Sequence, residues 1–155
     1  MNHNGNNFDK SSENGRKNSG KVNYKHQQNQ SQQYEHKPIN EDSLGKLIKD
    51  EANKVAKNIS TQTSYTQTRR FYDTLIQLQS KAKSLDNSKF QIEILPHVFL
   101  IKAQVKYACG RNHSGEYFSE FISKNIDDIT DKKSLDNFLL YFEAVLGFLK
   151  FHKEK

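Results

Sequence analysis

The spacing of apolar residues from position 41 onward constrains the fold more than any other feature of this sequence. Apolar side chains recur there every three or four residues, which is the repeat of an α-helix with one buried face. The alternation of apolar and polar residues that is typical of β-strands is hard to find. The pattern therefore predicts an all-α domain, a compact bundle of about five helices joined by short connections.

Capping side chains, proline and glycine mark where these helices begin and end. They predict five segments: about Asp42 to Asn58, near Tyr65 to about Ser84, Ser88 to Gly110, a helix after Ser114, and about Asp131 almost to the end. Ser64 and Ser88 each begin a Ser-x-x-Gln pattern, which is the form of a capping box at a helix start. Pro96 should kink or restart the third helix, because proline donates no backbone hydrogen bond.

The first 40 residues differ in composition from the rest of the chain. They contain six apolar side chains, scattered among Asn, Gln, Ser, Gly and Lys. Such a segment buries too little apolar surface to offset an ordering entropy of about 1 to 2 kcal/mol per residue. We therefore expect residues 1–40 to be a disordered polar tail and residues 41–155 to be the folded domain. These 40 residues contain six basic and three acidic side chains. The segment could therefore be a merely solvated tail or an arm that binds nucleic acid.

Composition also indicates the class of protein. The single cysteine, Cys109, excludes an intramolecular disulfide and fits a reducing compartment. The N-terminus lacks the apolar segment of a signal peptide, and no run of about 18 apolar residues predicts a membrane helix. We expect a cytoplasmic protein with no membrane partner. Its net charge of +6 and pI near 9.3 favour polyanionic partners.

The motifs that would mark an enzyme are missing from the sequence. None of the six histidines has a cysteine or a second histidine at metal-ligand spacing, and the glycines form no phosphate-binding loop. Glu143 lies among apolar residues with no second carboxylate at a useful spacing. We therefore expect no catalytic residue, no metal and no cofactor. A small RNA-processing enzyme would need a general base or a metal site that the chain does not visibly supply.

Basic residues on the second and third predicted helices are the candidate RNA contacts. Cations of this kind can follow a phosphate backbone without base-specific geometry, whereas the alternative is a merely solvated face. The candidate set is Arg69, Arg70, Lys102, Lys106 and Arg111. Because Arg69 and Arg70 point about 100° apart on a helix, we expect one to face RNA and the other to pair with an acid such as Asp73.

The last predicted helix is apolar on more than one face. One apolar stripe consists of Leu135, Phe138, Leu139, Phe142, Leu146 and Leu149. Tyr141, Phe148 and Phe151 lie outside this stripe. Either the helix is the centre of the bundle, or its second stripe meets another protein. On the second interpretation these three aromatic residues are the candidate subunit interface.

Three stretches carry a resemblance to a known family. In order along the chain they are "TQTRRFYDTL" (Thr66 to Leu75), "LIKAQVKYACGRN" (Leu100 to Asn112) and "LDNFLLYFEAVLGFLKFH" (Leu135 to His152). Together they resemble the small helical subunit of type III-A CRISPR effector complexes, the Csm small subunit. The resemblance covers nearly all of residues 60–152, and the long polar tail is not part of the family pattern.

The resemblance implies a non-catalytic protein that stacks in several copies along an RNA-guided complex in antiviral defence. Its partners would be the other subunits of that complex, copies of itself, and the target RNA paired with the guide. Base pairing with the guide would then read the sequence, so the subunit need contact only the RNA backbone. The alternative is a helical protein–protein adaptor whose partner binding is insensitive to RNA and to modest changes in salt.

Overall fold

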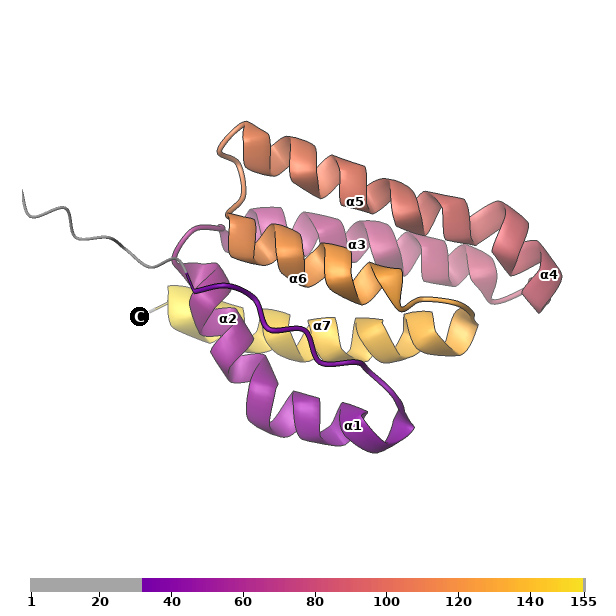
Figure 1. Cartoon of the computed structure of the whole chain (residues 1–155), viewed down its shortest axis with the longest axis horizontal. Coiled ribbons are helices and arrows are strands. Elements are labelled where there is room, and N and C mark those ends of the chain that lie inside the picture. Colours follow the sequence, from indigo (N-terminus) through magenta and orange to yellow (C-terminus); the bar gives the residue numbers. More distant parts are fainter. Residues whose placement is uncertain (1–31, 155) are drawn as a thin grey trace, which may run out of the picture. The chain divides into compact units, whose positions relative to one another are not determined.

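A computed structural model describes residues 32–154, and every regular element in this range is helical (Figure 1). The elements, including two π-helical turns η1 and η2, are α1 (Glu41–Lys46), η1 (Leu47–Glu51), α2 (Ala52–Ser60), α3 (Tyr65–Ala82), α4 (Asn87–Lys89), η2 (Phe90–Ile94), α5 (Leu95–Gly110), α6 (Glu116–Asp127) and α7 (Lys132–Lys153). Because α1, η1 and α2 are continuous, as are α4, η2 and α5, they form five helical segments. The predicted fold class is confirmed.

The helix starts follow local capping chemistry. The Ser64 hydroxyl accepts the Gln67 N–H at 3.1 Å, so α3 begins where the sequence predicts. The expected start of the third segment at Ser88 is wrong. The Asp86 carboxylate accepts the Lys89 N–H at 2.9 Å and caps the helix two residues earlier. The expected interruption at Pro96 is confirmed, since the wide turn η2 ends directly before α5, in whose first turn Pro96 lies.

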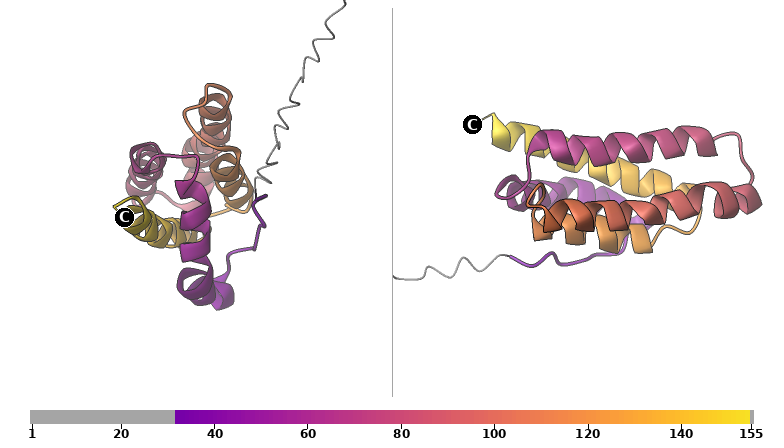
Figure 2. Two further views of the ribbon diagram at one scale, coloured as in Figure 1. Left: turned by 90° about the vertical axis from the view of Figure 1, so that its left-hand side faces the viewer. Right: turned by 90° about the horizontal axis from the view of Figure 1, so that it is seen from above.

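Helix α7 contributes more buried residues than any other described helix. It packs against α2 and α3 and also contacts α1 and η1; Figure 2 shows it in yellow beside α2. The rings of Phe118, Phe121, Phe138 and Phe142 are fully buried and contact one another, with centroids 5.5 to 6.4 Å apart. Truncating a buried ring of this kind to alanine costs about 3 to 5 kcal/mol. Aromatic packing between α6 and α7 therefore supplies a large part of the core.

The packing of α7 against its neighbours corrects one predicted interface residue. Tyr141 is only 2% exposed, and burial raises the pKa of its hydroxyl. Its ring packs on Phe121 of α6, with centroids 5.9 Å apart. Tyr141 is a core residue and not a subunit contact, because the neighbouring helices already cover it.

Helix α5 has an uncovered apolar face. It lies at one edge of the bundle and packs only on one side, against α6 and α3 (Figure 1). Its outer side, with the preceding turn η2, exposes Ile92, Phe99 and Leu100. The apolar pattern of the sequence predicts a second apolar face on α7 and does not indicate this one, because periodicity does not show which side of a helix its neighbours cover.

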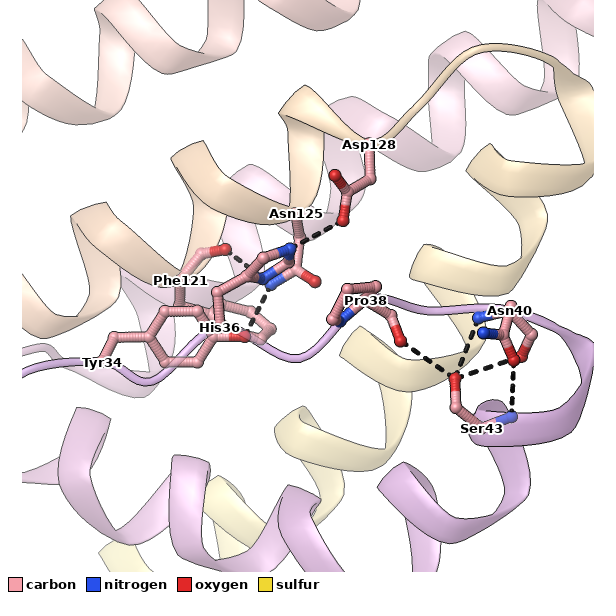
Figure 3. Close-up of polar contacts among 8 residues, drawn as sticks. All are labelled: Tyr34, His36, Pro38, Asn40, Ser43, Phe121, Asn125 and Asp128. Atoms are coloured by element: carbon pink, nitrogen blue, oxygen red, sulfur yellow. Dashed lines mark hydrogen bonds and ion pairs between the residues drawn. The ribbon is translucent and has the colours of Figure 1, made fainter.

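Residues 32–40, called the strap below, form an extended segment along α6 (Figure 3). Tyr34 is 3% exposed, and its ring meets those of Tyr117 and Phe121 edge-on, each at 5.5 Å. The Asn125 amide donates to the Tyr34 hydroxyl at 2.9 Å. The expectation that residues 1–40 stay apart from the fold is wrong for this segment, because one buried tyrosine anchors it. The rest of the predicted tail, residues 1–31, lies outside the described residues.

Within residues 32–154, no helix combines the length and the apolar character that crossing a membrane requires.

Candidate nucleic-acid interface

A groove between α3 and α5 contains one of the predicted cations and several other polar groups. It has a volume of about 410 Å³. Its lining residues are Gln67, Arg70, Phe71 and Thr74 on α3, Gln104, Tyr107 and Ala108 on α5, and His113 in the following loop. Arginine, amide, hydroxyl and aromatic groups thus meet at one surface. Such groups bind phosphate oxygens and stack on bases.

The two adjacent arginines have different surroundings. Arg69 donates to the Asp73 carboxylate at 2.9 Å and to the Tyr65 hydroxyl at 3.3 Å. The hydrogen bond with Tyr65, followed by that with Asp73, raises the pKa of the Arg69 guanidinium. Arg70 is exposed and lines the groove, and no acidic side chain among residues 32–154 pairs with it. The prediction that one of the pair binds Asp73 is confirmed, and Arg69 is that residue.

Arg111 lies beside the same groove, just beyond the end of α5. Its guanidinium carbon lies 5.6 Å from the centre of the Tyr107 ring, and its Nη1 donates to the Tyr107 hydroxyl at 2.8 Å. The next residue, Asn112, has a φ of 58°, a left-handed conformation that turns the chain sharply after the helix. The Tyr107 side chain is 65% exposed. A cation and an aromatic face are therefore presented together.

Lys102 and Lys106 point to the other side of α5, toward α6. The Lys102 ammonium pairs with the Asp127 carboxylate, and that of Lys106 pairs with Glu116 at 2.8 Å. The hydrogen bond with Glu116 raises the pKa of Lys106 and lowers that of Glu116. The five predicted cations therefore do not form one surface. Arg70 lines the groove and Arg111 contacts its Tyr107, whereas the other three each have a carboxylate partner.

The charge pattern of the sequence does not predict the uncharged part of this site. Gln104, Tyr107 and Thr74 line the groove but carry no charge, and only the packing of α5 on α3 brings them beside Arg70. One part of it could have been predicted from the stretch "KYACGRN". Tyr107 stands one helical turn before Arg111, and this spacing brings the two side chains together.

A second groove lies between α2 and the C-terminal half of α7. It has a volume of about 460 Å³ and is lined by Asn53, Ala144, Gly147, Phe148 and Phe151. The imidazole of His152 hydrogen-bonds to the Asn53 amide oxygen at 2.7 Å and ties the two helices together beside it. Two of the predicted interface residues, Phe148 and Phe151, thus contribute to one largely apolar hollow.

Across residues 32–154, histidine, cysteine and carboxylate side chains gather in no group of three or more that could hold a metal ion.

Comparison with known proteins identifies the family. A family model described as Csm2 Type III-A matches residues 42–155, which includes the α3–α5 groove and excludes the strap. No curated protein and no solved structure matches the chain. The resemblance seen in the sequence is thereby confirmed. This chain belongs to the Csm2 family, the structural small subunits of type III-A CRISPR-Cas effector complexes.

Proposed function

We propose that this chain is a non-catalytic subunit that stacks in several copies in its effector complex and contacts the backbone of the target RNA. The α3–α5 groove is the RNA-contacting surface. The observation that carries this assignment is the placement of Arg70 and Arg111. Neither guanidinium pairs with an acid within the described residues. Arg70 lines the groove, and Arg111 hydrogen-bonds to Tyr107, which also lines it.

The chemistry of the groove suits a backbone and not a base sequence. Guanidinium groups bind phosphate oxygens through two parallel hydrogen bonds, and phosphates carry no base identity. An exposed tyrosine ring stacks on any base, because every base has an aromatic face. Guide–target pairing supplies the sequence recognition in such a complex. Arg69, Lys102 and Lys106 remain part of the candidate set, but we expect smaller contributions, because each must exchange a carboxylate for a phosphate.

The apolar surfaces support contacts with other proteins. The α2–α7 groove and the outer side of α5 are separate surfaces on different helices. A subunit that stacks between neighbours needs two such surfaces, since each copy meets one neighbour on either side. A protein–protein adaptor that binds no RNA would use the same surfaces. Binding of RNA therefore distinguishes the proposed subunit from such an adaptor.

The test compares the double variant Arg70→Gln, Arg111→Gln with the matched control Lys81→Gln, Lys89→Gln. Both remove two exposed positive charges, and the control lysines lie at the opposite end of α3 and on α4. In a rebuilt effector complex, the arginine variant should bind labelled target RNA more weakly whatever its sequence. Its log-log slope against salt should flatten by about 0.7 to 0.9 per lost phosphate contact. Equal affinity and slope for both variants and the unchanged chain would leave only the adaptor function.

A further inference from the structure

The outer side of α5 carries an apolar stripe with the spacing of a helix–helix contact. Ile92, Phe99 and Leu100 are 43% to 76% exposed, and Pro96 and Ala103 are exposed beside them. From Ile92 through Pro96 and Phe99 to Ala103 the stripe advances by four, three and four residues. This spacing keeps side chains on one side of a helix, where they can meet a second helix. Helix α5 packs on α6 and α3 through its other side, so the helices of residues 32–154 leave this stripe uncovered.

The α2–α7 groove has a shape that complements this stripe. Its volume is about 460 Å³, and small residues, Ala144 and Gly147, line it between larger ones. A Cβ added at Gly147 meets no atom within 4 Å, so the groove is hollow at this point. Leu140, which is 50% exposed, precedes Ala144 by one helical turn, so the apolar surface of α7 extends beyond the groove. A large side chain in the middle of the α5 stripe, Phe99, suits this hollow as a knob suits a hole.

The charges beside the two surfaces are opposite in sign. Glu93 follows Ile92 at the start of the α5 stripe, and Lys57 lies one helical turn beyond Asn53, which lines the groove. Both side chains are exposed, and neither takes part in an ion pair within residues 32–154. The lysines of α5 and the other lysine of α2 already have carboxylate partners. An acid beside one surface and a base beside the other favour contact between the two surfaces and disfavour contact of either surface with itself.

The two surfaces belong to helices on opposite sides of the folded unit. In Figure 1, α5 and α7 lie on either side of α3 and α6. The α5 stripe of one copy therefore cannot reach the groove of the same copy, whereas it can reach the groove of another. Contact between two different surfaces is heterologous, and each copy then keeps one surface for a further neighbour.

Building on the function proposed above, in which several copies stack, we propose that the outer side of α5 in one copy packs into the α2–α7 groove of the next copy. Phe99 enters the hollow beside Ala144 and Gly147 and is the apolar anchor of the contact. Its occupant is thus a second copy of this chain, and the RNA-contacting α3–α5 groove is a separate surface.

The charged residues also give the contact a direction. Asn53 and Ser60 of α2 bind His152 and Lys153, so Lys57 between them lies near the C-terminal end of α7. Glu93 lies at the N-terminal end of the α5 stripe. Pairing of Glu93 with Lys57 of the next copy therefore makes α5 antiparallel to the α7 that it meets.

Cysteine cross-linking in the rebuilt effector complex tests this contact. Every full-length chain carries Cys109→Ser, which removes its single native cysteine and keeps a donor toward Glu116. Leu100→Cys marks the α5 stripe and Ala144→Cys marks the groove, on copies that carry two different tags. The matched control replaces Leu100→Cys by Lys81→Cys, an exposed position on α3. A short bismaleimide should join the two tags when Leu100→Cys and Ala144→Cys copies are mixed, and should join no copies when either variant is used alone or with the control.

A charge reversal tests the direction of the contact. Glu93→Lys should lower the cross-linked fraction, and adding Lys57→Glu to the same chain should restore it, because the two reversed side chains then meet across every contact. A second change that restores nothing would contradict the pairing of Glu93 with Lys57.

The copy number, counted by native mass spectrometry, separates the possible failures. If several copies are present and the mixture gives no cross-link, or Leu100→Cys copies join one another, this inference is overturned and the proposed function stands. If the complex holds a single copy, the proposed stacking fails as well.

Discussion

At the scale of single residues, Asp131 caps the start of α7. Its carboxylate accepts the Ser134 N–H at 2.7 Å, and the Ser134 hydroxyl in turn accepts the Asp131 N–H at 3.0 Å. This reciprocal pair is a capping box, and it satisfies two backbone groups that a helix start leaves free. The backbone hydrogen bond from Ser134, followed by that of its side chain, lowers the pKa of Asp131.

The cap predicts a pH-dependent loss of stability. Asp131→Ala should lower the free energy of unfolding by about 0.5 to 2 kcal/mol near pH 7. Because the folded-state pKa is lowered, the carboxylate's contribution is present above its unfolded-state pKa and is lost as the pH falls through the folded-state value. Urea unfolding of Asp131→Ala, Asp131→Asn and the unchanged chain at pH 7 and near pH 3 checks this. Asparagine also caps a helix but does not titrate, so Asp131→Asn should lose less stability between pH 7 and pH 3 than the unchanged chain. An equal loss in both would contradict the explanation.

The contacts of the two adjacent arginines, Arg69 and Arg70, were only partly predictable from the sequence. Helical geometry predicts that Arg69 and Arg70 diverge and that one can reach Asp73 four residues on. It does not say which of them faces the groove, because the groove exists only where α5 packs on α3. Lys102 and Lys106 show the same limit. Their partners Asp127 and Glu116 lie on α6, and no local pattern announces these contacts.

At the scale of elements, the strap determines where the folded part of the chain begins. A chain that starts at residue 32 should unfold at nearly the same temperature as the full chain. A chain that starts at Glu41 should be less stable by about 3 to 5 kcal/mol for the lost aromatic burial, and by about 1 kcal/mol for the lost cap Asn40. This corresponds to a fall of roughly 10 °C or more for a domain of this size. Thermal unfolding, monitored by circular dichroism, measures the melting temperatures of both shortened chains.

Two substitutions in the full chain separate the strap's contacts. Tyr34→Phe keeps the buried ring and removes only the hydroxyl that accepts from Asn125, so it should cost about 1 kcal/mol. Tyr34→Ala removes the ring and should approach the effect of starting at Glu41. A chain from Glu41 that melts with the full chain would show that the strap contributes nothing to the fold.

The strap was beyond sequence prediction for a physical reason. Residues 32–40 form no helix or strand before α1, so they show no periodicity, and their composition matches the polar residues before them. One buried side chain is enough to hold them, since Tyr34 combines ring packing with three hydrogen bonds. The five helical segments, in contrast, were predictable because each repeats its apolar contacts every turn.

At the scale of the whole molecule, the α2–α7 groove is our proposed site of subunit contact. Gly147 lines it, and a Cβ added there meets no atom within 4 Å. Gly147→Glu should therefore place a charge in the groove without disturbing the monomer, and should reduce self-association or incorporation into the effector complex. Gly45→Glu in α1 is the matched control, since a Cβ there also meets open space. Both variants should fold, because glycine destabilises a helix interior by about 1 kcal/mol relative to alanine, and glutamate is a better helix former than glycine.

Size-exclusion chromatography with light scattering and incorporation into the complex provide the measurements. Normal assembly by Gly147→Glu would exclude this groove as a subunit contact and favour the outer side of α5, another exposed apolar surface.

Membership of the Csm2 family makes assembly with RNA the central claim about the whole molecule. Affinity purification of the tagged chain from its native cell, followed by native mass spectrometry and sequencing of bound RNA, tests that claim most directly. We predict one large complex that contains several copies of this chain, other effector subunits and guide RNA. Recovery of the chain as a single copy, or with protein partners and no RNA, would contradict the proposed function.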